Sequence, residues 1–199
     1  MTTEPTGVGT VAEDAAPSPA TLRVGVVGVG ARSTILAHAE LPHNDAQVVA
    51  ACDPRPETEA RLRGWTRIDP AGVVITDNLD AFIAVGLDAA VVTSPDDTHA
   101  EITCRLLDAG IPVYLEKPMA IELDGATRIL QTAYDTGTRL YVGHNMRHMS
   151  VVRTMRDIIR RGEIGAVKAI WCRHFVGEGG DYYFKDWHAD RRYSNGLLL

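Results

Sequence analysis

LRVGVVGVGARS, residues 22–33, is the stretch that decides the fold of this chain. Its first six residues form a short valine-rich apolar run, which predicts a buried β-strand. The run leads directly into Gly28-Val29-Gly30-Ala31-Arg32-Ser33, a G-x-G-x-x-S turn. This turn matches the G-x-G-x-x-G/A pattern of dinucleotide-binding turns at every position except the last.

Gly28 permits the tight turn out of the strand, and Gly30 has no Cβ, so a pyrophosphate can approach the backbone. A helix that begins near Ala31 directs its free N–H groups and the positive end of its dipole at that phosphate. Glycine-rich turns also occur without a ligand, so the motif alone leaves a cofactor site and a plain turn equally open. The candidate cofactor contacts in this stretch are Gly28, Gly30, Ala31, Arg32 and Ser33.

After this turn, apolar runs alternate with helical patterns as far as residue 145. We expect strands over 47–52, 73–76, 88–93, 112–115 and 139–142, and helices over 56–64, 79–85, 98–110 and 122–136. Thr98-x-x-Glu101 is a capping box that opens the third of these helices. Continuous apolar strands separated by helices are typical of a parallel sheet covered on both faces. The sequence therefore predicts a doubly wound α/β domain over residues 21–145.

The two flanks of this domain differ from it in pattern. Residues 1–20 are rich in Thr, Pro, Ala, Gly and acids and have no apolar period, which predicts a disordered tail. Residues 150–161 form an amphipathic helix pattern, and 166–176 a longer strand with polar interruptions. We expect residues 146–199 to begin an α+β domain with an open, mainly antiparallel sheet, left incomplete where the chain ends in an apolar Leu-Leu-Leu. The helix residues expected to face inward are Val151, Val152, Met155, Ile158 and Ile159.

Composition excludes several classes of function. The 199 residues carry a net charge of −6, so no basic excess is available to hold nucleic acid or an anionic membrane. No apolar run approaches the roughly 20 residues that span a bilayer, and no export signal is visible. Cys52, Cys104 and Cys172 are widely spaced among apolar neighbours, which indicates reduced thiols, no metal site and a cytoplasmic protein.

Asp53 ends the second expected strand, at about the 20-residue spacing from the glycines that a ribose-binding acid occupies. A carboxylate there accepts hydrogen bonds from the adenosine ribose and repels a 2′-phosphate, which favours NAD. Arg55 could neutralise a 2′-phosphate, so NADP stays open. A structural turn at Asp53-Pro54 is the alternative reading.

Two further stretches follow strands at the same edge of the predicted sheet. Ser94 and Pro95 follow the fourth strand, where they would line the nicotinamide ribose. His99, at the start of the next helix, is either a further cofactor contact or a structural residue. Glu116-Lys117-Pro118 follows the fifth strand, and a lysine in a cofactor cleft can donate to a substrate hydroxyl oxygen.

Taken in order, these stretches resemble the Gfo/Idh/MocA oxidoreductases, the family of glucose–fructose oxidoreductase and inositol dehydrogenase. Two more stretches complete the resemblance, which covers nearly everything from residue 22 onward. They are Gly143-x-Asn145-x-Arg147 after the sixth strand and Arg161-Gly-Glu-Ile-Gly165 at the entry to the second domain. The resemblance implies a Rossmann domain and NAD(P)-dependent hydride transfer at a carbinol carbon of a sugar, cyclitol or related molecule.

The resemblance also implies roles for particular residues. Lys117 would be the active-site lysine that orients the substrate oxygen and relays its proton. Glu116 and Asn145 would lie at the cofactor, Arg147 would lie near the substrate, and the longer protein would form a homo-oligomer. Further candidates for the substrate pocket are His174, Tyr182, Tyr183, Lys185, Trp187 and His188.

One departure from the family leaves alternatives open. Members carry an Asp and a His three or four residues apart on a helix of the second domain, and this sequence ends at Leu199 before that helix. His188 and Asp190 lie upstream of those positions, and we do not assign them the role of base. The alternatives are therefore an oxidoreductase present as its N-terminal part, a non-catalytic dinucleotide-binding module, or an inactive fragment.

Overall fold

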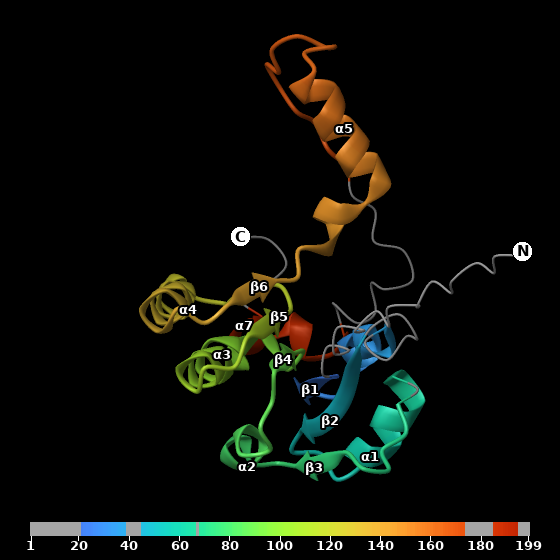
Figure 1. Ribbon diagram of the computed structural model, residues 1–199. Coiled ribbons are helices and arrows are strands. Elements are labelled where there is room, and N and C mark those ends of the chain that lie inside the picture. Colours follow the sequence, from blue (N-terminus) through green and yellow to red (C-terminus); the bar gives the residue numbers. More distant parts are fainter. Residues whose placement is uncertain (1–20, 39–44, 67, 174–184, 195–199) are drawn as a thin grey trace, which may run out of the picture.

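The computed structural model describes residues 21–38, 45–66, 68–173 and 185–194. Their centre is a six-stranded sheet in the order β3-β2-β1-β4-β5-β6, in which every neighbouring pair is parallel (Figure 1). Strand order reverses between β1 and β4, so the predicted doubly wound parallel sheet is confirmed. The strands are β1 (Leu22–Val27), β2 (Ala46–Cys52), β3 (Val74–Thr76), β4 (Ala89–Val92), β5 (Val113–Leu115) and β6 (Leu140–Val142).

The helices cover both faces of this sheet. On one face lie η1 (Ala31–His38), α1 (Thr58–Arg61) and η2 (Leu62–Thr66), which contribute Leu36 and Leu62 to a cluster with β1 and β2. On the other lie α2 (Leu79–Ile83), η3 (Asp96–Thr98), α3 (His99–Asp108) and α4 (Leu123–Thr136). Phe82, Leu106 and Ile129 of these helices form a second cluster with residues of β1, β2, β4 and β5. Burial on both sides explains why the strands read as continuous apolar runs.

The start of α3 differs from the prediction. Thr98 does not cap the helix with its side chain; its Oγ1 lies 2.7 Å from both Ser94 Oγ and the Pro95 carbonyl oxygen. The backbone of Thr98 is already helical, because the single turn η3 precedes α3. The capping-box prediction is therefore wrong, and the Thr98 hydroxyl stabilises the turn after β4 instead.

Beyond β6 the chain continues through η4 (Asn145–His148) and α5 (Ser150–Arg160), and Figure 1 shows α5 projecting away from the sheet. The helix was expected, but three of the five residues expected to face inward are exposed: Val151, Met155 and Ile159, at 55%, 51% and 43%. The other two, Val152 and Ile158, are half-buried. Residues 166–173 form no strand, and 174–176 lie outside the described residues. A strand needs a neighbour for its backbone hydrogen bonds, and none lies beside 166–173 among the described residues. The second domain and the domain limits stay predictions.

The last described stretch, 185–194, holds the short turn η5 (Trp187–Ala189) and α7 (Arg191–Ser194). Although it is distant in sequence, α7 packs against η3, next to the carboxyl ends of β4 and β5 (Figure 1). Residues from the C-terminal part of the chain therefore lie at the sheet edge that carries the predicted site. The predicted tail over 1–20 lies outside the described residues.

Candidate cofactor site

The glycine turn after β1 is crowded at Gly28 and open at Gly30. Gly28 has φ +89°, and a Cβ added there would lie 2.4 Å from the Ser94 backbone nitrogen. Only glycine fits, because the turn must pass this close to the end of β4. A Cβ added at Gly30 would meet nothing nearer than Arg55 Nη2, at 4.0 Å. The turn thus presents backbone to open space at the one position where a phosphate would approach.

Ser33 occupies the position of the third glycine and is completely buried. Its N–H and its hydroxyl both donate to the Gly30 carbonyl oxygen, at 3.0 and 2.6 Å. These bonds hold the first turn of η1 against β1, so a serine provides the close helix–strand packing that the motif requires. The N–H groups of Ala31 and Arg32 lie at the exposed beginning of this helix.

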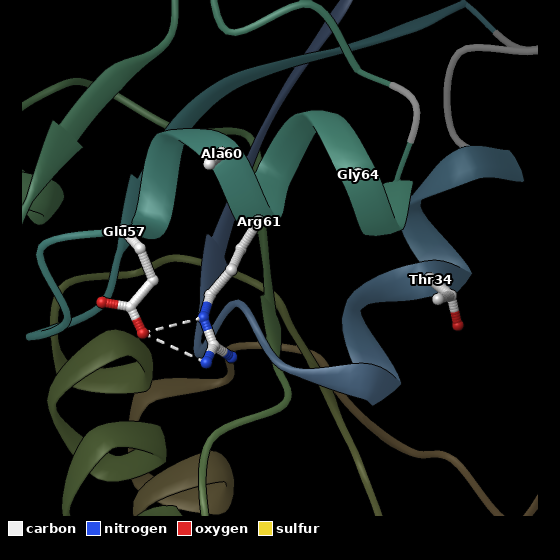
Figure 2. Close-up of a pocket in the computed structure, with 5 residues that line it drawn as sticks. All are labelled: Thr34, Glu57, Ala60, Arg61 and Gly64. Atoms are coloured by element: carbon white, nitrogen blue, oxygen red, sulfur yellow. Dashed lines mark hydrogen bonds and ion pairs between the residues drawn. The ribbon is translucent and has the colours of Figure 1, made fainter.

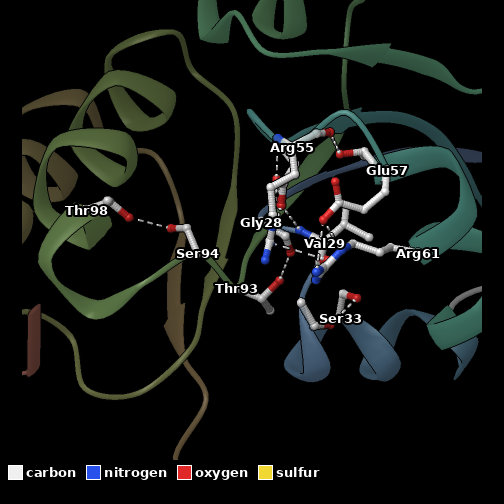
Figure 3. Close-up of polar contacts among 12 residues, drawn as sticks. Gly28, Val29, Ser33, Arg55, Glu57, Arg61, Thr93, Ser94 and Thr98 are labelled. Atoms are coloured by element: carbon white, nitrogen blue, oxygen red, sulfur yellow. Dashed lines mark hydrogen bonds and ion pairs between the residues drawn. The ribbon is translucent and has the colours of Figure 1, made fainter. Parts of the chain in front are cut away.

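Asp53 and Arg55 form a tight pair where β2 ends. The Asp53 side chain is 1% exposed, and its Oδ2 accepts from the Val29 N–H at 2.7 Å. Arg55 donates to the same carboxylate from Nε at 2.8 Å and from Nη2 at 2.6 Å. Burial raises the pKa of the Asp53 carboxyl, but the hydrogen bonds from Arg55 and Val29 outweigh burial and hold it below its usual value. Figure 3 shows Arg55 above Gly28 and Val29.

On the β4 side, His99 is completely buried and links two loops of the candidate site. Its Nδ1 lies 2.7 Å from the Pro118 carbonyl oxygen and its Nε2 3.0 Å from that of Ser94. A carbonyl oxygen only accepts, so both contacts are hydrogen bonds together only when the ring is doubly protonated. His99 therefore connects the turn after β4 with the loop that carries Lys117, and has no exposed surface with which to contact a cofactor.

Glu116 and Lys117 follow β5 at the same edge. Glu116 is 3% exposed and forms an ion pair with Arg32, whose guanidinium reaches it from the start of η1. Lys117 is exposed, and its backbone N–H donates to Glu116 Oε2 at 3.1 Å. Its side chain therefore projects from a loop that a buried carboxylate and His99 both hold in place.

Asp96 was not among the candidates from the sequence, although it directly follows Ser94-Pro95. Burial raises the pKa of its carboxyl, and the positive charges of His99, Lys117 and His188 oppose that shift. The Asp96 carboxyl is thus close enough to sense the charge of Lys117. Its place one turn after β4, at the shared edge of a parallel sheet, is the signal that could have identified it.

The remaining candidates are more scattered. Asn145 and Arg147 are exposed in η4, just after β6. The His188 and Trp187 rings stack with centroids 3.6 Å apart, and His188 Nδ1 lies 2.6 Å from Asp186 Oδ1. Lys185 is exposed at the start of this described stretch. Outside the described residues lie His174, Tyr182 and Tyr183.

Two surface hollows lie near this edge of the sheet. One of about 430 Å³ lies between η1 and α1, and in Figure 2 it is lined by Thr34, Ala60, Gly64 and the Glu57–Arg61 ion pair. A second, of about 440 Å³, lies between η3, α3 and α4 and is lined by Asp96 together with Asp97, Glu122, Asp124 and Arg128. Neither is lined by Gly30 or Lys117. Among the described residues no group of three or more His, Cys, Asp or Glu could hold a metal ion, and no helix is long and apolar enough to cross a membrane.

The residues at this edge fit a dinucleotide. Gly30 leaves room for a phosphate beside the start of η1, which carries Arg32, and Arg55 Nη2 borders that space. Lys117 lies further along the same edge, after β5. An anionic cofactor that lies across the ends of β2, β1, β4 and β5 would meet all of them. The sequence predicted these positions; that two of the arginines are held by buried carboxylates is apparent only in the structure.

Comparison with known proteins agrees with this geometry. The family model described as "Oxidoreductase family, NAD-binding Rossmann fold" (GFO_IDH_MocA) matches residues 22–144. The inositol 2-dehydrogenases of Burkholderia multivorans and Rhizobium meliloti are 32% and 31% identical over 83% and 75% of this chain. The chain spans about half the length of these relatives, 49% and 44%.

A solved structure is similar over the same region. It is the WlbA dehydrogenase from Bordetella pertussis in complex with NADH and UDP-GlcNAcA. The match has a TM-score of 0.65 at 28% identity and covers 73% of this chain and 44% of that one. The similarity supports the parallel-sheet fold.

Proposed function

Because this chain belongs to the Gfo/Idh/MocA oxidoreductase family, we propose that it carries the cofactor site and the active-site lysine of an NAD(P)-dependent dehydrogenase. Its substrate is a cyclitol or sugar-like molecule that is oxidised or reduced at a CH–OH group. One observation carries the proposal: the open turn at Gly30 and the exposed Lys117 lie at the same edge of one parallel sheet.

The cofactor is held by backbone and by charge. The N–H groups at the start of η1 bind the pyrophosphate where Gly30 leaves room. Arg32 adds positive charge on the β5 side of the turn and Arg55 on the β2 side. Ser94 and Pro95 line the nicotinamide half. The bound cofactor supplies the hydride chemistry, and the protein supplies position and electrostatics.

Lys117 acts on the substrate oxygen. Its ammonium group donates a hydrogen bond to that oxygen and stabilises negative charge there. In the direction of reduction Lys117 gives this proton to the oxygen and becomes a neutral amine, and in the direction of oxidation the neutral amine accepts the hydroxyl proton. Glu116 and His99 hold the backbone of this loop, from which the Lys117 side chain extends. Asp96 lies within electrostatic range of Lys117.

The substrate class rests on the relatives. Several of them, from different bacteria, are named inositol 2-dehydrogenase, which supports a cyclitol over an acyclic substrate. Among the described residues, the candidates for contacting it stay Asn145, Arg147, Lys185, Trp187 and His188. A homo-oligomer and a cytoplasmic location stay predictions from the sequence.

A binding experiment tests the cofactor site. NADH is titrated into the chain by fluorescence, with Gly30→Val to fill the open position and Gly64→Val as a control where an added Cβ meets nothing within 4 Å. We expect Gly30→Val to raise the Kd for NADH about 10-fold or more, which corresponds to a loss of about 1.4 kcal/mol of binding free energy. The control Gly64→Val should bind NADH like the unmodified chain. Equal NADH affinity of the two variants would contradict a cofactor site at Gly30.

A turnover experiment tests Lys117. NAD(P)-linked oxidation of inositol isomers and sugars is followed by absorbance for the unmodified chain and for Lys117→Met. We expect the variant to lower kcat by about 10²–10⁴-fold, the usual contribution of a positioned proton-transfer group, with its NADH affinity nearly unchanged. Turnover by Lys117→Met at the unmodified rate, or none by the unmodified chain with any of these substrates, would overturn the proposed activity.

A further inference from the structure

Arg32 and Glu116 form an ion pair that joins two loops of the site directly. Arg32 lies at the start of η1, just after the glycine turn, and Glu116 comes directly after β5, 84 positions further along the chain. Among the ion pairs of the described residues, none joins residues further apart in the sequence. Because β4 separates β1 from β5, the pair crosses the end of β4 and spans a strand-to-strand distance of about 10 Å.

The Glu116 carboxylate is the buried end of this pair. Its side chain is 3% exposed, and its two oxygens have different partners. Oε1 accepts from Arg32 Nη2, and Oε2 accepts from the backbone N–H of Lys117 at 3.1 Å. A buried carboxylate that loses its cation is left without compensation, so the fold favours the paired arrangement. One carboxylate therefore holds both the start of η1 and the backbone of the residue that acts on the substrate.

Two further buried contacts tie the intervening strand β4 to each loop. Thr93, at the end of β4, donates from Oγ1 to the Gly28 carbonyl oxygen at 2.6 Å. His99, after the turn that follows β4, contacts the loop after β5 through the Pro118 carbonyl oxygen at 2.7 Å. Each of these contacts fixes one loop to the β4 side, whereas the ion pair fixes the two loops to each other. The three elements therefore form one connected unit at the carboxyl edge of the sheet.

A dinucleotide makes the separation of these two loops important. In the proposed site its pyrophosphate lies at the start of η1, and its nicotinamide half runs towards the ends of β4 and β5. The reacting carbon must then meet a substrate held by Lys117, and a misplacement of about 1 Å can lower the rate by about 10²-fold. The distance between the glycine turn and the loop that carries Lys117 must therefore match the cofactor.

Resting on the function proposed above, we propose that the Arg32–Glu116 ion pair is a positioning bridge, which sets the loop that carries Lys117 at the separation from the glycine turn that the nicotinamide half requires. Arg32 acts here through Glu116 and not on the reacting atoms. This role is separate from the charge that Arg32 adds beside the pyrophosphate, because that charge acts alike on every ligand that contains a pyrophosphate.

A ratio of affinities isolates the nicotinamide half. NADH and ADP-ribose, which contains the pyrophosphate but no nicotinamide, are titrated by calorimetry into the unmodified chain, Arg32→Gln, Glu116→Gln and the double variant. The surface control is Arg63→Gln, whose arginine pairs with Glu59 at 3.9 Å. We expect each single variant to lose about 10-fold more affinity for NADH than for ADP-ribose. The double variant should recover part of that loss, since two amides can bond to each other and no buried carboxylate lacks its cation. Arg63→Gln should change the affinity for neither ligand.

Turnover measures the effect on Lys117. NAD-linked oxidation of inositol isomers is followed by absorbance for the same variants. We expect Arg32→Gln to lower kcat about 10-fold or more, because the cofactor and Lys117 are no longer aligned. The substrate KM should stay within about 3-fold, because no substrate contact is removed. Arg32→Lys should keep part of kcat, since lysine retains the charge but not the planar fork of donors. Circular dichroism and the melting temperature of each variant establish that it is folded.

The outcomes separate the two proposals. If Arg32→Gln weakens NADH and ADP-ribose equally, Arg32 serves only as a charge beside the pyrophosphate, the bridge is wrong and the proposed function survives. Losses that simply add in the double variant would also overturn the bridge, because the two residues would then act independently. If NADH binds but no substrate is turned over, the proposed activity fails and the ratio of affinities still decides the bridge. If the folded chain binds neither ligand, both proposals fail.

Discussion

Helices α4 and α5 are both amphipathic in sequence, but α4 packs against other helices and the sheet, whereas the apolar face of α5 is largely exposed. Both carry apolar residues at helical spacing, and both form where that spacing predicts. In α4, Ile129 is completely buried and Gly125 lies against Ala100 of α3. In α5, Met155 and Ile159 are about half exposed. Helical spacing therefore identifies a helix and its apolar face, but does not show that a partner for that face is at hand.

The difference follows from what each helix meets. The chain leaves β5 and returns to β6 through α4, so the crossover places that helix on the sheet beside α3. Helix α5 begins after the last strand of the sheet and projects away from it (Figure 1). No described element covers its apolar face.

The largest effect expected from this difference comes from truncating one isoleucine in each helix. Ile129→Ala should lower the free energy of unfolding by about 2–5 kcal/mol, because it leaves a cavity between α4 and the sheet. Ile159→Ala should change it by about 0.5 kcal/mol or less, as for other exposed positions. Urea denaturation of both variants gives the two values. A loss at Ile159 as large as that at Ile129 would show that α5 is packed in solution.

A smaller effect is expected at a polar contact inside the packed region. His99→Phe keeps the ring volume but removes the ring nitrogens, so the Pro118 and Ser94 carbonyl oxygens lose their contacts with the buried side chain. We expect a loss of about 1–3 kcal/mol. The control is His148→Phe in η4, where the ring contacts Tyr141 at an exposed position, and the loss there should be about 0.5 kcal/mol or less. Equal thermal stability of the two variants would contradict the buried bridge.

The pH dependence of the free energy of unfolding should reveal the contribution of the Asp53–Arg55 ion pair. The pKa of Asp53 is lowered in the folded state, so its ionised form stabilises the fold. That stability is present above the ordinary carboxyl pKa of about 3.9 and is lost as the pH falls through the lower folded value. Asp53→Asn should therefore be less stable than the unmodified chain by about 1–3 kcal/mol at pH 6. The gap should narrow as the pH approaches 3, and a gap independent of pH would contradict the pairing.

The last comparison concerns chemical accessibility and involves no change in stability. Burial, with the nearby charge of Asp53, raises the pKa of Cys52 in β2 to about 11, whereas Cys172 beyond α5 is exposed. Iodoacetamide reacts with the thiolate, so it should modify Cys172 well before Cys52 in the folded chain. Mass spectrometry of peptides after short exposure measures both. Modification of Cys52 at the rate of Cys172 would show that the sheet opens.

Local patterns were enough to predict much of the fold. The strands end within a residue or two of their predicted limits, because continuous apolar runs are a property of neighbouring residues on a doubly covered sheet. The expected strand at 166–176 was wrong over its described part, because pairing depends on a neighbour that the run itself does not specify. The capping box failed for a related reason: a turn upstream had already fixed the backbone of Thr98.

The sequence by itself determined the order of strands and helices and the positions of Gly28, Gly30, Asp53 and Lys117 along them, since spacing and residue type are carried by the chain. Only the tertiary structure decided which atoms those residues meet. Arg55 closes over Asp53, Arg32 reaches Glu116 across the turn, and His99 joins two loops. Such contacts form where the strands and helices bring side chains to one edge, and the sequence pattern does not specify which donor meets which acceptor there.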